Sequence, residues 1–438
     1  LVMDHRRGLA RSRPGGRCRG WLAAAALAAA AACSASRLLE EVPCWSTPPR
    51  GGSQPGSLTP TLLRGSPGAA AAGRLRRGAA TTEAAPASDA QEEEGGLARR
   101  VALGGAAVVA ALFAVKRFGV DGNMAEFDPP PGSLAGRTIL ITGANTGLGR
   151  ESAVRLARAG ATVIITARSD DKGKEAEAAI RAASGSGAVY YEQLDLADLA
   201  SVKTFSSRLQ QQPYGDHLDV LMNNAGVMAI PERQETKDGF ERQLGVNHLG
   251  HFALVGLLLP LLRKAKDYAR VINVSSTAHL AATKENFEGD LMDPAKYTPW
   301  GAYGQSKIAN VLFAKELDRR FKANGIKATA VSCHPGGVDT DLARYLIAGN
   351  EDAKKAKELR DSSPLFQSIV PVFSRTVQLG ANTQIYLAAG ADGGLDRSGG
   401  GYFDNMGPGL LNPLANDEAL AKRLWDESER LTGVKISL

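Results

Sequence analysis

From residue 136 onward, short apolar runs alternate with longer stretches in which apolar positions recur every three or four residues. Apolar runs of about four to eight residues are typical of strands covered on both faces, and the longer spacing is typical of amphipathic helices. The expected strands are residues 138–142, 162–167, 189–194, 220–223, 271–275 and 328–333. The expected helices are residues 148–159, 172–183, 202–212, 240–262, 302–323 and 417–431.

This regular alternation predicts an α/β fold in which helices cover both faces of a parallel sheet. We expect a Rossmann-type, doubly wound parallel sheet in a single domain over residues 136–433, preceded by a long N-terminal leader. The alternation stops between residues 341 and 375, where Pro364 and Pro371 interrupt a mixed sequence. Such a segment is suited to a mobile lid over a substrate pocket.

The leader, residues 1–98, has a different composition. A basic stretch at 6–19 precedes an apolar run at 21–32 and small residues at 33–36, which is the order found in secretory signal peptides. Residues 45–90 are rich in Ser, Pro, Gly, Ala and Arg and nearly free of acids, as transit peptides are. Together they predict a bipartite address that delivers the chain to a plastid (chloroplast); a plain disordered tail is the alternative.

A second uncharged apolar run, residues 101–115, lies within the segment 99–118 between two basic pairs. A helix that crosses a bilayer core needs ~20 apolar residues, so this run is short. A membrane anchor, an interfacial helix and a second, thylakoid-type signal all remain open, and membrane association with them.

The formal net charge of +6 arises mainly in the leader, where arginines outnumber acids. The expected domain has no basic stripe interleaved with aromatic residues, so we expect no nucleic-acid partner. Of the four cysteines only Cys333 lies in this domain, which excludes a disulfide within it and predicts a buried thiol. No cysteine or carboxylate pattern joins His248 and His251, so we assign no metal.

The first expected strand runs into a glycine-rich turn, and a helix follows. Glycines allow a tight turn and a close approach of the backbone to a pyrophosphate, and the free N–H groups of a helix N-terminus attract its charge. This strand–turn–helix context predicts a dinucleotide site. Its expected contacts are Gly143, Asn145, Thr146, Gly147, Leu148, Gly149 and Arg150.

Arg168 follows the second expected strand directly. An acid at this position binds the ribose 2′-hydroxyl of NAD, whereas an arginine suits a 2′-phosphate. Arg150 can reach the same phosphate, so we expect NADP(H) as the cofactor. If the strand ended later, Asp170 or Asp171 could face the ribose instead.

Tyr303 and Lys307 are four residues apart on an expected helix and therefore share one face. A free tyrosine has a pKa of about 10, and an adjacent ammonium group favours the phenolate. We expect the pKa of Tyr303 to be lowered toward the working pH. The phenol could then exchange a proton with a carbonyl or alcohol oxygen.

The glycine-x-x-x-glycine-x-glycine spacing, the Asn-Asn-Ala-Gly segment and the Tyr303/Lys307 pair together resemble the short-chain dehydrogenase/reductase family, over residues 136 to about 433. The resemblance implies that Tyr303 and Lys307 also contact the cofactor, the lysine at the nicotinamide ribose. It implies adenine-side contacts after the third and fourth strands and nicotinamide contacts after the sixth. These residues are Asp195, Leu196, Asn224, Ala225 and Gly226, and then Pro335, Gly336, Val338 and Thr340.

The same resemblance completes a catalytic group of Asn247, Ser276, Tyr303 and Lys307. Ser276 would hydrogen-bond the substrate oxygen, and Ser275 would take its place if the register differs by one residue. Asn247 would hold a water of the proton relay behind the lysine.

Tyr303 follows Ser276 by 27 residues, and the segment between them carries Phe287, Tyr297 and Trp300. This long segment resembles the retinol dehydrogenase-like branch, which includes a plastid inner-envelope translocon component. The resemblance implies NADP(H)-dependent interconversion of a small hydrophobic aldehyde or ketone and its alcohol. Family members often form dimers or tetramers, so a homo-oligomer remains open. The alternatives are a redox-sensing NADP-binding scaffold on a plastid membrane and a protochlorophyllide reductase-like pigment reductase.

Overall fold

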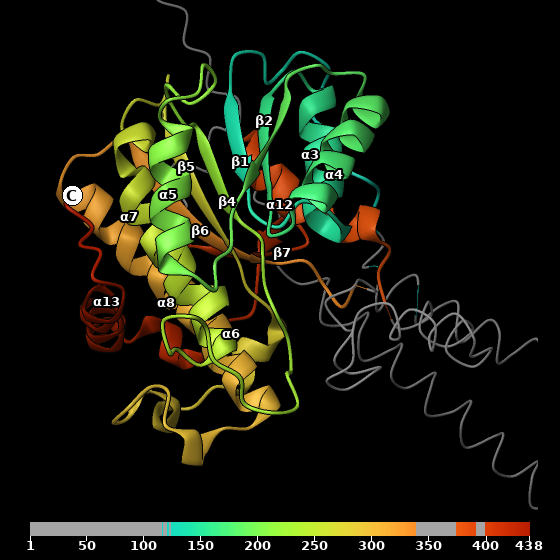
Figure 1. Ribbon diagram of the computed structural model, residues 1–438. Helices are drawn as coiled ribbons and strands as arrows, with labels where there is room; N and C mark the ends of the chain where they lie inside the picture. The colour runs from blue at the N-terminus through green and yellow to red at the C-terminus, as the bar shows by residue number, and fades with distance from the viewer. Residues whose placement is uncertain (1–115, 117–120, 122–123, 339–373, 391–398) are drawn as a thin grey trace, which may run out of the picture. The chain divides into compact units, whose positions relative to one another are not determined.

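Eight strands form one sheet in the order β3-β2-β1-β4-β5-β6-β7-β8 (Figure 1). Neighbouring strands are parallel except for β7 and β8, which are antiparallel. The strand order reverses between β1 and β4, which lie side by side. The strands are β1 Thr138–Ile141, β2 Thr162–Ala167, β3 Val189–Gln193, β4 Val220–Asn223, β5 Ala269–Val274, β6 Ala328–His334, β7 Tyr402–Asp404 and β8 Gly407–Pro408.

These elements belong to one compact unit, Ala114–Leu438, of a computed structural model. The leader, the apolar run 101–115, Thr340 and residues 341–373 of the expected lid lie outside the described residues. The described residues are 116, 121, 124–338, 374–390 and 399–438.

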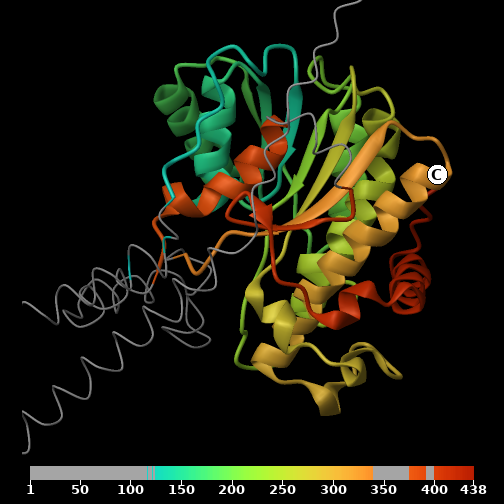
Figure 2. The same ribbon diagram turned by 180° about the vertical axis from the view of Figure 1, so that it is seen from behind.

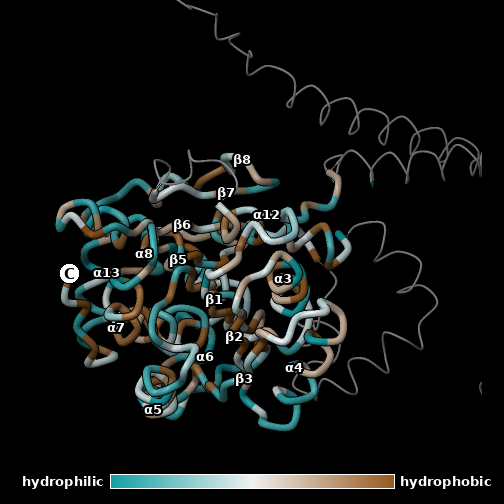
Figure 3. Tube along the Cα trace, turned by 90° about the horizontal axis from the view of Figure 1, so that it is seen from above, coloured by the Kyte–Doolittle hydropathy of each residue, from teal (hydrophilic) through white to brown (hydrophobic). Residues whose placement is uncertain are grey.

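Helices cover both faces of the sheet (Figure 3). Helices α3, α4 and α12 lie on one face, and α5, α7 and α8 lie on the other, with α13 packed outside α8. Four short helical turns, η3, η4, η5 and η8, lie in the connections. The helices are α3 Gly147–Arg158, α4 Asp170–Ser184, α5 Leu199–Leu209, α6 Arg242–Leu244, π-helix η2 Gly245–Leu249, α7 Gly250–Leu262, η3 Thr277–Ala281, η4 Lys284–Phe287, η5 Pro294–Lys296, α8 Pro299–Ala323, α12 Val377–Ala389, η8 Pro413–Asn416 and α13 Glu418–Thr432.

The two faces of the sheet bury two separate hydrophobic cores. In β1, Leu140 joins the core under α5, α7 and α8, whereas Ile139 and Ile141 join the core under α3, α4 and α12. All three side chains are fully buried. Because successive side chains of a strand point to opposite faces, an apolar run without polar positions is what a sheet covered on both faces requires.

The structure confirms the predicted α/β fold and the six predicted strands, whose ends differ by at most two residues. The sequence did not predict β7, β8 and α12. The two strands are only 3 and 2 residues long. Helix α12 packs beside α3 on the sheet and buries the polar residues Asn382, Thr383 and Gln384 among its apolar ones, so its sequence shows little amphipathic contrast.

The helical run from Arg242 to Leu262 is the one span within the described part of the chain that is long and apolar enough to cross a membrane. Of its most apolar stretch, 83% is buried inside the protein. It packs against α5 and the sheet as a core helix.

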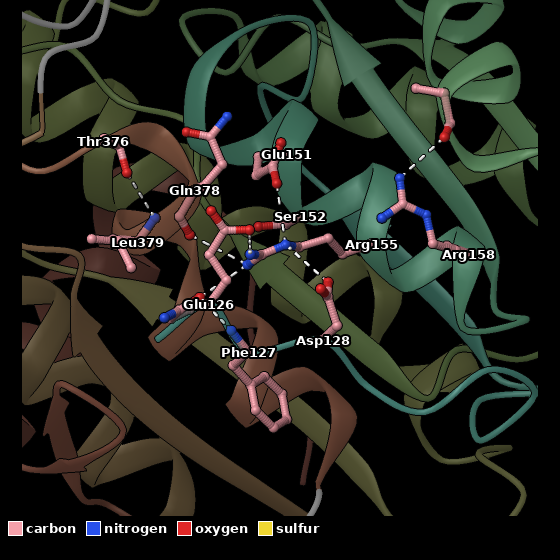
Figure 4. A network of polar contacts seen from close by, with 12 residues as sticks. Glu126, Phe127, Asp128, Glu151, Ser152, Arg155, Arg158, Thr376, Gln378 and Leu379 are labelled. Carbon is pink, nitrogen blue, oxygen red and sulfur yellow. Dashed lines mark hydrogen bonds and ion pairs between the residues drawn. The ribbon is translucent and has the colours of Figure 1, made fainter. Parts of the chain in front are cut away.

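A buried arginine ties the start of the unit to two helices (Figure 4). Arg155 on α3 is 2% exposed and its guanidinium lies 3.1–3.2 Å from the carboxylates of Glu126, Asp128 and Glu151. It also donates to Oδ1 of Asn382 on α12, at 2.9 Å. Segment 124–128, α3 and α12 are therefore joined through one side chain.

We expect Arg155→Ala to lower the free energy of unfolding by about 2–3 kcal/mol, because it leaves the buried Asn382 amide without this donor and removes the partner of three carboxylates. Arg158, one turn later on α3, is a matched control because it makes only an exposed bond to the Ala183 carbonyl (Figure 4). Arg158→Ala should cost at most about 0.5 kcal/mol. Urea unfolding of both variants checks this, and equal losses would contradict it.

Candidate active site

The glycine-rich turn lies between β1 and α3, at the point where the strand order reverses, which is where doubly wound sheets bind ligands. Gly143 and Gly147 have φ angles of 63° and 56°, which other residues rarely adopt. A Cβ atom on Gly149 would lie 2.8 Å from the Gly143 carbonyl oxygen. No side chain caps the N-terminus of α3, and its first turn carries no acid. The first N–H groups of α3 are thus available to an anion.

The Asn224–Gly226 segment, after β4, is held against this turn by Thr142. The Thr142 hydroxyl accepts hydrogen bonds from the backbone N–H groups of Asn224 (2.9 Å) and Ala225 (3.0 Å). In return, the Asn224 amide donates to the Thr142 carbonyl oxygen at 2.8 Å. A Cβ atom on Gly143 would lie 2.9 Å from Cβ of Ala225, so the two segments approach as closely as their backbones allow.

The same hydroxyl also contacts a buried histidine. Nε2 of His251 lies 2.9 Å from Thr142 Oγ1, and its Nδ1 lies 3.0 Å from the Asn247 carbonyl oxygen. Since a carbonyl can only accept, Nδ1 carries the proton and Nε2 accepts from Thr142. Burial lowers the pKa of His251 to about 4, so the ring is neutral. From the sequence, His251 could be weighed only as a metal ligand, and its contact with Thr142 was not predicted.

Asn247 lies in the π-helix η2, a single turn of a kind often found at functional sites. Its side-chain amide donates to the Val227 carbonyl and to Ser306 Oγ, both at 2.9 Å, and its Oδ1 accepts from the Val227 N–H. A Cβ atom on Gly226 would lie 3.2 Å from Asn247 Oδ1 and 3.5 Å from Lys307 Nζ. The side chains of Asn247 and Lys307 thus both lie close to Gly226, which follows β4.

The two candidate serines differ in what their hydroxyl groups do. Ser275 Oγ donates to the Lys307 carbonyl oxygen at 2.7 Å and fixes helix α8 to the end of β5. Ser276 Oγ accepts from the Ala278 N–H at 3.2 Å and hydrogen-bonds the phenol of Tyr303. The geometry therefore places Ser276, rather than Ser275, beside the phenol.

Tyr303 and Lys307 are both buried on α8, 3% exposed each, and Lys307 Nζ lies 5.5 Å from the centre of the Tyr303 ring. Burial raises the pKa of Tyr303 to about 12, and the Ser276 hydrogen bond opposes this only in part. Burial lowers the pKa of Lys307 to about 8, and its Nζ donates to the Val274 carbonyl oxygen at 3.1 Å. The expected lowering of the Tyr303 pKa is therefore not seen, because desolvation outweighs the nearby cation.

Several comparisons place this chain among known proteins. A family model described as short chain dehydrogenase matches residues 137–351. Human retinol dehydrogenase 13 is 39% identical over 308 residues, which cover 70% of this chain and 88% of that protein. Mouse retinol dehydrogenase 14 is 40% identical over 349 residues (75% and 97%), and mouse polyprenol dehydrogenase is 39% identical over 328 residues (74% and 91%). The crystal structure of an uncharacterised protein from Mycobacterium paratuberculosis is 36% identical, with a TM-score of 0.53, and covers 72% of this chain and 100% of that one.

The chain belongs to the short-chain dehydrogenase family. The relatives confirm the predicted retinol dehydrogenase-like branch, and with it an NAD(P)-dependent alcohol oxidoreductase.

In this short-chain dehydrogenase, β2 ends at Ala167 and the exposed Arg168 follows at once. Asp170 and Asp171 form the first turn of α4, and Asp170 pairs with Lys174 at 2.6 Å. The alternative in which a longer strand brings one of these acids to the ribose is therefore not what the structure shows. Arg150, in the first turn of α3, is also exposed.

The turn after β6 is fixed by Arg375, which the sequence analysis did not single out. Its backbone N–H donates to the Gly337 carbonyl at 2.6 Å, and its guanidinium donates to the Pro335 carbonyl at 3.2 Å. Gly336 has a φ of 90°, and a Cβ atom there would lie 2.5 Å from this side chain. Val338 forms a bridge with Arg375, and Thr340, the last predicted contact of this turn, lies outside the described residues.

The long segment between Ser276 and Tyr303 is held by side chains from elsewhere in the fold. The Gln305 amide donates to the carbonyl oxygens of Asn286 (2.5 Å) and Leu291 (3.0 Å). Arg423 of α13 donates to the Phe287 carbonyl at 2.8 Å. Three carbonyl groups of this segment are therefore bonded to α8 and α13, which fixes its path between the two catalytic residues.

A pH-dependent stability follows from the buried lysine. Because the pKa of Lys307 is lowered from 10.5 to about 8, the unfolded chain binds this proton more tightly than the folded chain. The charged lysine therefore destabilises the fold at pH 7, and this penalty fades as pH rises from about 8 to about 10.5. We expect Lys307→Met to raise the free energy of unfolding by up to about 3 kcal/mol at pH 7, and by much less at pH 10. Denaturant unfolding at both pH values tests this; a gain that is equal at both would contradict it.

Proposed function

We propose that this short-chain dehydrogenase interconverts a hydrophobic aldehyde or ketone and the corresponding alcohol with NADP(H), using Tyr303 as the general acid and base. The observation that carries the proposal is the buried contact between the Ser276 hydroxyl and the Tyr303 phenol, with Lys307 behind the ring. Two hydroxyl groups that meet in this way can both hydrogen-bond one substrate oxygen.

The protonation states suit the reduction of a carbonyl group. With a pKa of about 12, Tyr303 keeps its proton at neutral pH and can donate it to a developing alkoxide. The Ser276 hydroxyl can donate a hydrogen bond to the same oxygen, and the Lys307 ammonium group stabilises the phenolate that remains. The nicotinamide, when bound, supplies or accepts the hydride.

NADP(H) rather than NAD(H) is supported by the charges after β2. Arg168 follows the strand directly, and the nearest acids belong to the first turn of α4. The free N-terminus of α3 suits the pyrophosphate, and Arg150 in its first turn adds a second cation near the expected 2′-phosphate.

A hydrophobic substrate is supported by the exposed apolar side chains. The large hydrophobic residues exposed in the described part of the chain are Leu280, Trp300 and Leu410, at 39%, 53% and 76%. The Trp300 ring packs edge-on against Tyr303 with 6.0 Å between ring centres, and Leu280 follows Ser276 by four residues. An exposed tryptophan packed against the reacting tyrosine fits an apolar substrate with one polar end.

Delivery to a plastid remains part of the proposal and depends on the leader. Its test is independent of the enzymology: residues 1–98 fused to a fluorescent protein should direct it to the plastid of an algal cell. Fluorescence left in the cytosol would reject the address.

We expect Tyr303→Phe to lower kcat by about 10²–10⁴-fold, because it removes the hydroxyl group and with it the only ionisable proton of the side chain, with little change in NADPH affinity. The assay follows NADPH consumption with retinal and with medium-chain aldehydes, and fluorescence titration measures NADPH binding. Equal rates in the two proteins would reject the role of Tyr303. NADPH binding without turnover of any substrate by the wild type would favour the redox-sensing scaffold instead.

We expect Arg168→Gln to raise the KM for NADPH by about 10–100-fold and to leave the KM for NADH within about twofold, because only the former has a 2′-phosphate. Arg158→Gln, an exposed arginine of α3, serves as the matched control. If both coenzymes lost affinity equally, Arg168 would act on the shape of the site and not on the phosphate.

A further inference from the structure

The main chain of Ser276 is held by a histidine that the reaction does not use. His279, in η3, is fully buried, and its Nδ1 lies 2.6 Å from the Ser276 carbonyl oxygen. The backbone N–H of His279 donates to the same oxygen at 3.1 Å. The residue whose hydroxyl meets Tyr303 is thus fixed by two hydrogen bonds at its carbonyl group.

The other side of His279 is held by the segment that leads into α13, which passes beside the segment after Ser276 (Figure 2). The backbone N–H of Asn412 points at His279 Nε2, at 3.4 Å. The Asn412 amide donates to the carbonyl oxygens of His279 (3.0 Å), Leu280 (3.2 Å) and Ala282 (2.8 Å). One asparagine side chain therefore satisfies three carbonyl oxygens of the turn that begins at Ser276.

These partners fix the tautomer of His279. The Ser276 carbonyl oxygen, 2.6 Å from Nδ1, makes the shortest contact of the ring and takes its one proton. Nε2 is then left to accept from the Asn412 N–H at 3.4 Å, and the Leu410 backbone also lies within hydrogen-bond reach of the ring. Burial lowers the pKa of His279, which keeps the ring neutral. The Tyr402 ring, with 4.7 Å between ring centres, packs against the imidazole and limits its rotation.

We propose that His279, held by Asn412, is a positioning residue that fixes the Ser276 hydroxyl against Tyr303. Ser276 Oγ accepts from the Ala278 N–H inside the same turn, so the position of the hydroxyl oxygen depends on the path of the main chain there. The role in turnover rests on the proposed function, but the positioning of the hydroxyl does not.

Two variants of similar shape test the hydrogen bonds of the two ring nitrogens one at a time. The amide nitrogen of Asn can take the place of Nδ1, and the amide oxygen of Gln can take the place of Nε2. His279→Asn therefore keeps the donor to Ser276, whereas His279→Gln keeps only the acceptor for Asn412. Both remove one hydrogen bond and part of a buried ring, so their melting temperatures should fall by similar amounts.

We expect His279→Gln to lower kcat about tenfold and His279→Asn less than about threefold, with the KM for NADPH within about twofold in both. In a Ser276→Ala background the two variants should have the same kcat. Equal losses in the two single variants, or a difference that persists without Ser276, would overturn the proposal.

A second measurement does not depend on turnover. The ¹³Cζ signal of Tyr303, among nine labelled tyrosines and assigned through Tyr303→Phe, reports the hydrogen bond from Ser276. His279→Gln should shift this signal as Ser276→Ala does, and His279→Asn should leave it in place. If this pattern appeared in a protein that reduced no carbonyl substrate, the positioning would stand and the proposed reaction would fail. If the pattern were missing, the inference would fail whatever the activity.

Discussion

The Thr142 hydroxyl group is the contact on which the arrangement of the site depends. It accepts from two backbone N–H groups of the segment after β4 and donates to His251, which in turn holds the Asn247 carbonyl. The glycine turn of β1, the segment after β4 and the π-helix are therefore joined at one fully buried oxygen. In a low-dielectric interior a missing partner would be costly, so all these bonds must form together.

Around this contact, the Lys307 ammonium group is buried, and no carboxylate among the described residues pairs with it. The partner of the Lys307 ammonium group is the Val274 carbonyl oxygen rather than a carboxylate, and burial lowers its pKa to about 8. A carboxylate in this place would hold the lysine charged and weaken its effect on the phenol. Keeping the cation next to Tyr303 therefore lowers the stability of the fold.

Local sequence was enough to predict the sheet and the glycine turn, because both follow from patterns within about ten residues. It was not enough for β7 and β8, which are too short to show a period, or for α12, which buries polar residues among its apolar ones. The roles of His251, His279 and Arg375 also escaped, because each acts on a backbone group whose partner is set by the tertiary fold. Asn412 is 133 residues from His279, and no spacing rule joins them. The predicted direction of the Tyr303 pKa shift was wrong for a similar reason, because the sequence shows the neighbouring cation but not the depth of burial.

The Arg155 network has a consequence for proteolytic trimming of the leader. Glu126 and Asp128 supply two of its three carboxylates, and the Phe127 N–H and Ala125 carbonyl bond the Asn382 amide on α12. A cleavage before residue 124 would leave this attachment whole, whereas a cut after Asp128 would take two carboxylates from Arg155 and two hydrogen bonds from Asn382. Helix α12 would then be held to α3 only by their direct bonds, such as those of Asn382 and Gln384. Helix α12 also contacts Val338 and Leu148 through Gly380, so the loss would reach both ends of the dinucleotide site. The first residues that this domain needs are thus set by the contacts of one guanidinium group.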